Sequence, residues 1–293
     1  MNKKLMILGG SGYLGSSLCS YFKDSNYDVI SYGYSKKSQL VLDATDYSLL
    51  EESLLHYLPN VIINCIGFTD VNGCELEPEK AFSLNSRVAF NIASCIQKNK
   101  LDTYLIQIST DHVYDNPCAS LEEEVVLRNY YAYSKLIGDL YARDVQSAVL
   151  RTNFIGLNNK CPNVGFTEWI YNTLSSGKII NAFDDILFNP LSLDSLAKYI
   201  TKIVDLRPEG VYNLGSSDGI SKAEFILFFA KELDLQTSLV NVVSSENSNH
   251  SNVNRPKSML MNCNKIEELL DISMPTTLEE IKSVAEPYKI SRG

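Results

Sequence analysis

The stretch Leu5-Met6-Ile7-Leu8-Gly9-Gly10-Ser11-Gly12-Tyr13-Leu14-Gly15 decides the fold, because an apolar run ends there in a glycine-rich turn and a helical pattern follows. Residues 5–8 are typical of a buried strand, and residues 14–22 carry apolar side chains at helical spacing. A G-x-x-G-x-x-G pattern at such a junction allows a tight turn and a close approach of backbone amides to a diphosphate. It predicts a dinucleotide site, with an ordinary glycine-rich turn as the alternative. The residues expected to form it are Gly9, Ser11, Gly12, Tyr13, Leu14 and Gly15.

Short apolar runs alternate with amphipathic segments beyond this stretch, a pattern typical of βαβ units on a parallel sheet. Further strands are expected at 29–32, 61–63, 104–108 and 148–150, and further helices at 48–57, 78–97 and 131–143. The sequence Ser48-Leu49-Leu50-Glu51 suggests a capping box. After about residue 150 the alternation is less regular. Helices are expected there at 167–175, 192–204, 222–233 and 277–284, with a strand at 211–214 and a loop-like stretch at 244–254.

These elements predict an α/β fold, a Rossmann-type doubly wound parallel sheet with a smaller C-terminal substrate-binding lobe. Residues 1–156 are expected to form the NAD(P)-binding domain, and residues 157–293 mainly the substrate lobe. Segments around 182–215 are expected to return to the first domain.

The charge balance excludes some classes of partner. The 293 residues include 26 Lys and Arg against 35 Asp and Glu, a formal net charge of −9. Broad nucleic-acid or anionic membrane surfaces depend on cationic side chains, so neither partner is expected. Seven cysteines without a C-x-x-C pair and only three histidines favour reduced thiols in a cytoplasmic protein and no metal site.

The end of the second expected strand bears on the choice of cofactor. An NAD enzyme usually has an Asp or Glu there for the ribose 2′-hydroxyl. This chain instead has Tyr34, Ser35, Lys36 and Lys37. A hydroxyl and two ammonium groups suit a 2′-phosphate, which favours NADP(H) over NAD(H). The alternative is a pair of solvated loop lysines.

Two further motifs predict the reacting groups. Ser109, Thr110 and Asp111 follow a buried strand, where side chains can project into the crevice at the carboxyl edge of the sheet. Tyr131 and Lys135 are four residues apart on an expected helix and share one face, so the ammonium can lower the pKa of the phenol for proton transfer. A turn or helix cap, and an aromatic helix face packed on the core, are the respective alternatives.

The glycine motif, the S-T-D sequence and Y-x-x-x-K, in this order, resemble the extended short-chain dehydrogenase/reductase family. Five further stretches resemble dTDP-4-dehydrorhamnose reductase and related sugar-nucleotide reductases: 43–46, 64–71, 84–85, 108–115 and 150–156. The resemblance is specific over the first 156 residues. His112, Tyr114, Asn116 and Ala132 depart from the residues usual in these reductases.

The resemblance implies roles for individual residues. Thr110, Tyr131 and Lys135 would be catalytic, and Thr69, Thr110, Asp111, Asn153 and Arg255 would bind substrate. A capped turn for Asn153 and a surface guanidinium for Arg255 remain the alternatives. Cofactor contacts are implied at Asp43, Ala44, Cys65, Ile66, Gly67, Asn85, Ser109, Tyr131 and Lys135.

The sequence thus predicts an NAD(P)-dependent oxidoreductase that uses NADPH to reduce the C4 keto group of a 4-keto-6-deoxy sugar nucleotide in deoxysugar or surface-polysaccharide biosynthesis. Three alternatives stay open: an NAD-retaining epimerase or dehydratase, a regulatory subunit resembling the methionine adenosyltransferase β subunit, and an NADP-binding redox sensor. A nucleotide-sugar substrate is the expected partner, and a homodimer is an open expectation.

Overall fold

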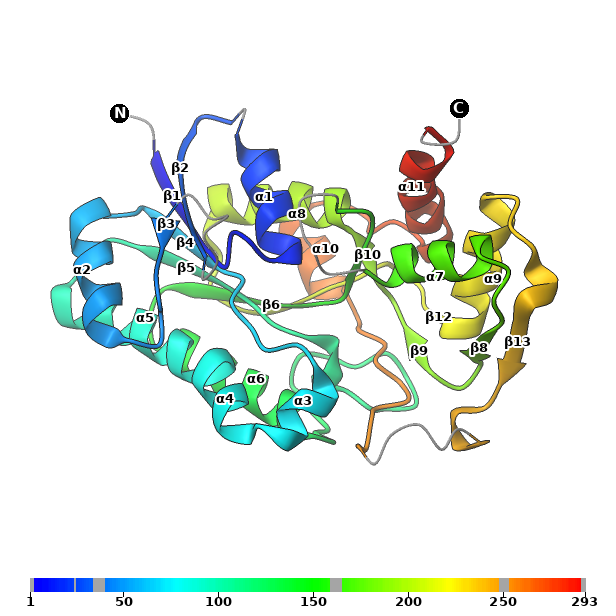
Figure 1. The fold of residues 1–293 in the computed structure, drawn as a ribbon. Coiled ribbons are helices and arrows are strands. Elements are labelled where there is room, and N and C mark those ends of the chain that lie inside the picture. Colours follow the sequence, from blue (N-terminus) through cyan, green and yellow to red (C-terminus); the bar gives the residue numbers. More distant parts are fainter. Residues whose placement is uncertain (1–2, 24, 34–39, 159–164, 248–252, 291–293) are drawn as a thin grey trace. The chain divides into compact units, whose positions relative to one another are not determined.

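The computed structural model describes residues 3–23, 25–33, 40–158, 165–247 and 253–290. Its centre is a seven-stranded parallel sheet (Figure 1). The strands lie in the order β11 (Gly210–Leu214), β6 (Ser147–Thr152), β5 (Tyr104–Ile108), β4 (Val61–Asn64), β1 (Lys3–Leu8), β2 (Tyr27–Gly33) and β3 (Leu40–Val41). The predicted α/β, Rossmann-type fold class is confirmed.

Helices cover both faces of this sheet, which explains why its central strands are largely apolar. In Figure 1, α1 (Tyr13–Phe22) and α8 (Leu193–Leu206) lie on one face, and α2 (Tyr47–Tyr57), α5 (Val88–Asn99) and α6 (Tyr130–Ala142) lie on the other. β4 is buried over its full length, and β5 is too. The sheet therefore forms a rigid support, and side chains at its strand ends are held in fixed positions.

Two local predictions were wrong. The cap of α2 is Asp46, whose carboxylate accepts from the backbone N–H groups of Ser48 and Leu49, so Ser48 does not begin a capping box. The predicted helix at 78–97 is interrupted: α4 (Pro78–Phe82) continues through a π-helical turn, η1 (Ser83–Arg87), into α5. A π-helical turn redirects side chains, and this one places Asn85 in the interior.

Contacts between residues divide the chain into two compact units that interleave along the sequence. The sheet unit comprises residues 1–110, 129–151 and 197–212, and the second unit comprises 111–128, 152–196 and 213–293. The sequence suggested a boundary near residue 156, with segments around 182–215 returning to the first domain. By these contacts, residues 197–212 belong to the sheet unit, and residues 182–196 and 213–215 to the second unit. Residues 111–128 join the second unit because Ser120 bridges to Met261 and the Tyr114 hydroxyl donates to Asn213.

The second unit has its own apolar core, formed largely by helices α7 (Phe166–Ser175), α9 (Lys222–Glu232) and α11 (Thr277–Ile290). Short strand pairs complete it: β10 (Leu191–Ser192) with β7 (Phe154–Ile155), β12 (Ile220–Ser221) with β9 (Leu187–Phe188), and β13 (Val240–Val243) with β8 (Ile180–Phe183). The sequence did not predict α3 (Val71–Leu76) or α10 (Asn264–Leu270), both of which are short.

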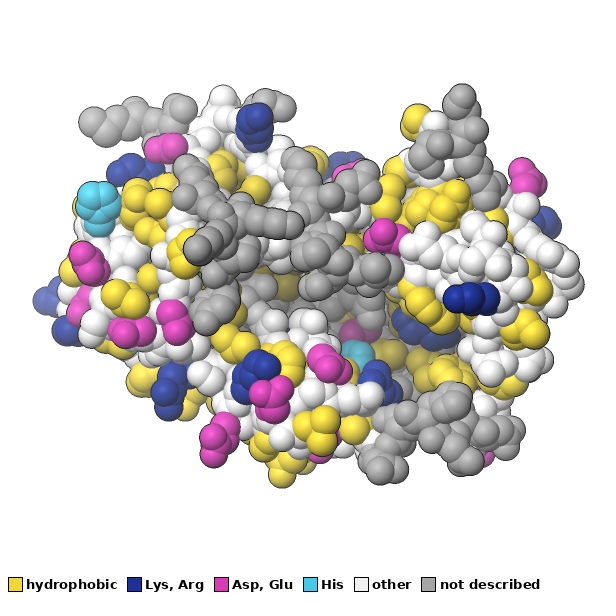
Figure 2. Space-filling model, in the orientation of Figure 1, with side chains coloured by type: hydrophobic (Ala, Val, Ile, Leu, Met, Phe, Trp, Pro, Cys, Tyr) yellow, Lys and Arg dark blue, Asp and Glu magenta, His cyan; other side chains and the backbone are white. Residues whose placement is uncertain are grey.

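The surface fits the acidic composition. On the face shown in Figure 2, the Lys and Arg side chains of the described residues are scattered among acidic and apolar ones. No helix in the described part of the chain is both long and apolar enough to cross a bilayer.

Candidate active site

The glycine turn between β1 and α1 is packed so closely that side chains are excluded from it. Gly9 has φ +84°, and a Cβ there would lie 3.0 Å from the carbonyl carbon of Cys65. A Cβ at Gly15 would lie 2.2 Å from the carbonyl oxygen of Gly9. No side chain caps the first turn of α1, whose N-cap is Gly12. The N-terminal amides of a helix favour an anion, so this turn suits a diphosphate.

A cavity of about 740 Å³ opens beside this turn in the sheet unit. Eight residues predicted to contact the cofactor line it: Gly9, Ser11, Gly12, Asp43, Ala44, Cys65, Ile66 and Gly67. Seven others do not line it: Tyr13, Leu14, Gly15, Asn85, Ser109, Tyr131 and Lys135. Tyr34, Ser35, Lys36 and Lys37 lie outside the described residues. The amide-lined turn and the cavity beside it fit a dinucleotide.

Several lining residues were missed by the sequence reasoning. They are Leu8, Tyr32, Gly33, Leu42, Thr45, Glu79, Lys80, Ser83, Leu84 and Val88. Five of these come from α4, η1 and α5, which reach the cavity only because these helices pack across the sheet. No motif marks them. Lys80 is a cation in this wall, but Glu77 accepts from its ammonium at 3.0 Å, and Phe68 lies 4.4 Å beneath it.

Lys135 is buried and fixed by the sheet. Only 4% of its surface is exposed, and its ammonium donates a 2.7 Å hydrogen bond to the carbonyl of Ile108 at the end of β5. Burial lowers the pKa of Lys135, and the Asp139 carboxylate opposes this. A Cβ at Gly67 would lie 3.8 Å from the ammonium nitrogen. Lys135 therefore stands just behind a residue of the cavity wall.

Tyr131 lies one turn before Lys135 on α6 and is 7% exposed. The helix begins where the Asn129 side chain accepts from the backbone N–H of Ala132 at 3.0 Å. Thr110 is 4% exposed and lies two residues beyond Ile108. The hydrogen bond from Lys135 to Ile108 thus ties the helix that carries the tyrosine to the strand that leads to the threonine.

Asn85 connects the cavity wall to α6. Its carbonyl oxygen accepts from the backbone N–H of Phe68 at 2.7 Å, and its amide donates to the Ser134 hydroxyl at 2.9 Å. A Cβ at Gly138 would lie 2.2 Å from the Asn85 backbone oxygen, so only glycine allows this approach. Asn85 is therefore a positioning residue within the sheet unit.

A buried ion pair also holds α6 to the sheet. The guanidinium Nε of Arg151 on β6 lies 3.2 Å from an Asp139 carboxylate oxygen, and both residues are almost fully buried. Burial raises the pKa of Asp139, and Arg151 opposes this. No sequence motif identifies this pair, because the two residues meet only through packing.

The remaining substrate candidates divide between the two units. In the sheet unit, Thr69 is exposed next to Gly67. In the second unit, buried Asp111 accepts a 2.7 Å hydrogen bond from the Asn153 amide. Arg255 is exposed. Burial lowers the pKa of His112, and the positive charges of Lys222 and Arg255 add to this effect. Asn153 is thus a partner of Asp111.

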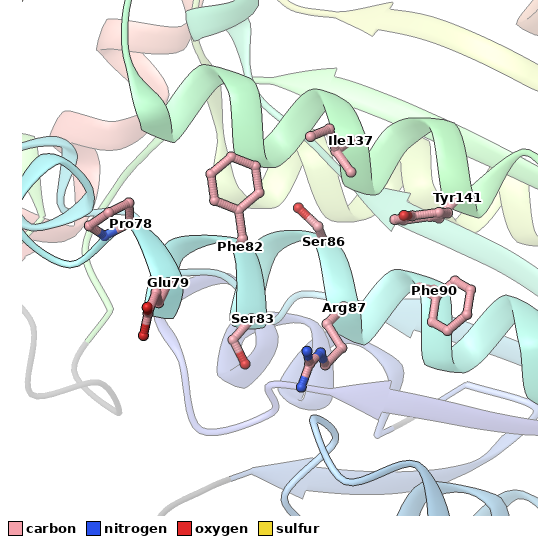
Figure 3. A pocket seen from close by; sticks show the side chains of 9 residues that line it. All are labelled: Pro78, Glu79, Phe82, Ser83, Ser86, Arg87, Phe90, Ile137 and Tyr141. Atoms are coloured by element: carbon pink, nitrogen blue, oxygen red, sulfur yellow. The ribbon is translucent and has the colours of Figure 1, made fainter.

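A second hollow, of about 790 Å³, lies on the outer side of the sheet unit between η1 and α6. Figure 3 shows Phe82 and Ser86 pointing toward α6, whereas Glu79, Ser83 and Arg87 point away from it. Ile137 and Tyr141 contribute from α6.

The family can now be assigned. A family model described as RmlD substrate binding domain matches residues 3–290. The chain belongs to this RmlD family. The sequence motifs predicted a resemblance to dTDP-4-dehydrorhamnose reductase and other sugar-nucleotide reductases. This resemblance is confirmed at the level of the family.

Curated relatives of this RmlD-family chain are similar along most of their length. The probable low-salt glycan biosynthesis reductase Agl14 of Haloferax volcanii is 24% identical, over 96% of this chain and 97% of that protein. The spore coat polysaccharide biosynthesis protein SpsK of Bacillus subtilis is 26% identical, over 90% and 91%. The methionine adenosyltransferase 2 subunit beta of Rattus norvegicus is 23% identical, over 92% and 83%.

Solved structures share the fold. The dTDP-4-dehydrorhamnose reductase of Bacillus anthracis, in complex with NADP, has a TM-score of 0.88 at 22% identity, covering 98% of this chain and all of that one. The Bordetella bronchiseptica enzyme WbmG, in complex with NAD and UDP, has a TM-score of 0.80 at 17% identity, covering 100% and 96%. The reductases among these proteins are of the NAD(P)-dependent oxidoreductase class expected for this chain.

Proposed function

We propose that this RmlD-family chain is an NADPH-dependent reductase of the C4 keto group of a 4-keto-6-deoxy sugar nucleotide. The observation that carries the proposal is the anchoring of Lys135 to Ile108, beside Gly67 in the wall of the dinucleotide cavity. This anchoring supports a catalytic group of Tyr131, Lys135 and Thr110, placed where α6 meets the end of β5.

The cofactor would be held by the glycine turn and the cavity beside it, and when bound it supplies a hydride for the carbonyl carbon. Tyr131 donates its phenolic proton to the carbonyl oxygen as negative charge develops there. The Lys135 ammonium stabilises the resulting phenolate, and the Thr110 hydroxyl donates to the same carbonyl oxygen. Asn85 and the Asp139–Arg151 pair keep α6 in place.

The preference for NADPH rests on Lys36 and Lys37, which follow β2 in the sequence. β2 itself brings Tyr32 and Gly33 to the cavity wall, and Lys36 and Lys37 follow Gly33 by three and four residues in the sequence. Two ammonium groups there suit a ribose 2′-phosphate.

The direct test follows NADPH oxidation with a panel of 4-keto-6-deoxy sugar nucleotides that differ in base and sugar. Oxidation dependent on one of them supports the proposal, and no oxidation with any of them contradicts it. Purified protein that retains NAD and shows no net NADPH consumption would favour the epimerase or dehydratase alternative. Co-purification with a methionine adenosyltransferase, without reductase activity, would favour a regulatory subunit.

We infer further that the chain forms a homodimer through the hollow of Figure 3. Phe90 lines it and is 45% exposed, and Tyr133 and Leu140 of α6 are 47% and 52% exposed.

A further inference from the structure

Lys222 is a charged group that the proposed reaction does not use. It is the first residue of α9, and its backbone N–H donates to the Ile186 carbonyl at 2.9 Å, which fixes the start of the helix. Its ammonium nitrogen lies 3.2 Å from the centre of the Phe188 ring and 4.5 Å from that of Phe166. It forms no hydrogen bond and no ion pair with any residue that the structure describes.

The position of this ammonium is unfavourable in the protein alone. Contact with two ring faces attracts a cation, but it supplies no oxygen in place of the water lost on burial. Burial lowers the pKa of Lys222 to about 7, and only the Asp111 carboxylate opposes this. A neutral side chain of similar length, such as Met, would pack against the same rings without this cost.

The charge of Lys222 acts on two groups of the second unit. The Asp111 carboxylate, a predicted substrate residue, opposes the lowering of the Lys222 pKa, and it also accepts a hydrogen bond from the Asn153 amide. Burial lowers the pKa of His112, and the positive charge of Lys222 adds to this. All of these residues belong to the second unit. Lys222 therefore lies in the neighbourhood of two predicted substrate residues, Asp111 and Asn153.

We propose that Lys222, supported by the rings of Phe188 and Phe166, binds an anionic oxygen of the substrate. The inference rests on the proposed function, because the nucleotide sugar is the ligand in question. The oxygen belongs to the diphosphate, which is the anionic group of such a substrate. A partly buried ammonium without an acceptor gains a charge-assisted hydrogen bond when the diphosphate binds.

The test compares Lys222→Met, Lys222→Arg and Lys231→Met. The last is a matched control, since Lys231 lies on the same helix and is exposed. Calorimetric titration with UDP, dTDP and GDP measures affinity without turnover. Lys222→Met is expected to weaken nucleoside diphosphate binding on the order of ten- to a hundredfold, as the loss of a hydrogen bond to a charged group does. Lys222→Arg should keep most of the affinity, and Lys231→Met all of it. Binding of NADPH should be unchanged in all three variants.

The other outcomes separate the possibilities. Wild-type affinity of Lys222→Met for all three nucleoside diphosphates overturns the inference and leaves the proposed function standing. A wild-type protein that binds no nucleoside diphosphate and no nucleotide sugar overturns both.

Discussion

The ammonium of Lys135 donates a 2.7 Å hydrogen bond to the backbone carbonyl of Ile108, the last residue of β5. This bond joins the helix that carries Tyr131 to the strand end that leads to Thr110. Because Lys135 is 4% exposed, water does not compete for the bond. The relationship explains why the tyrosine and the lysine must share a helix face, and it also gives the lysine a structural role.

Replacement of Tyr131 by Phe should remove turnover and leave cofactor binding intact. General acid catalysis contributes about 10²- to 10⁴-fold, so kcat should fall by that factor. Tyr133→Phe is the control, because Tyr133 is 47% exposed on the same helix. Steady-state kinetics and NADPH titration check both variants. A Tyr131→Phe enzyme with the wild-type rate would assign proton donation to another residue.

Replacement of Gly15 by Ala should disrupt the glycine turn. The new Cβ would lie 2.2 Å from the Gly9 carbonyl oxygen and 2.9 Å from the Gly10 Cα, both of them backbone atoms. Overpacking of this kind costs about 1–3 kcal/mol, and it should also weaken cofactor binding because the amides move. Urea unfolding and NADPH titration measure the two effects.

Gly177→Ala provides the comparison for this variant. Gly177 has φ +73°, and no described heavy atom lies within 4 Å of a Cβ there. This change should cost about 1–2 kcal/mol from the left-handed backbone alone, with normal NADPH affinity. Equal cofactor affinity in Gly15→Ala and Gly177→Ala would argue against a diphosphate at the turn.

The preference for NADPH predicts a selective effect of Lys36→Ala combined with Lys37→Ala. The KM for NADPH should rise about tenfold or more, because hydrogen bonds to a charged group contribute about 1.5–3 kcal/mol, and the KM for NADH should not change. The control is Lys198→Ala with Lys202→Ala on α8, which removes the same charge elsewhere in the sheet unit. An unchanged KM for NADPH in the first variant would remove the basis for NADP specificity.

Lys222 should make stability depend on pH. Its pKa is about 7 in the folded protein against 10.5 in its ordinary state, so the unfolded chain binds more protons between these values. The free energy of unfolding therefore rises with pH through this window. Lys222→Met lacks this dependence. Its stability advantage over the wild type should be largest below pH 7 and shrink toward pH 10. Urea unfolding of both proteins at several pH values measures this difference, and a constant difference would contradict it.

The sequence predicted the sheet unit well for a physical reason. Strands such as 104–108 and 61–63 are buried on both faces, so apolar composition alone identifies them. The glycine turn could also be predicted from the sequence, because Gly9 and Gly15 are required by the local backbone. The interruption of the helix at 78–97 could not be predicted in this way. Asn85 lies in the π-helical turn and hydrogen-bonds to both Phe68 and Ser134, which are brought together only by the tertiary structure.

The same limit applies to the candidate site. Tyr131 and Lys135 could be paired from their spacing of four residues, since a helix brings such residues to one face. Lys80 and Ser83 in the cavity wall, and the pair of Asp139 with Arg151, depend on helix packing across the sheet. The position of Lys222 could not be predicted either, because Phe188 and Phe166, which its ammonium contacts, are distant from it in the sequence.

The proposed homodimer predicts an effect on mass in solution. Phe90→Glu should shift the protein toward monomer, because it places a charge in an apolar interface. Sedimentation equilibrium should show at least a tenfold weaker association for this variant, with circular dichroism unchanged.

A second surface variant separates this interface from a general loss of solubility or folding. Leu278→Glu is the control for Phe90→Glu, since Leu278 is 43% exposed on α11 of the second unit and its replacement should leave the mass unchanged. A loss of mass in both variants would point to a general effect of the added charge. If Phe90→Glu remains a dimer, the second copy binds elsewhere.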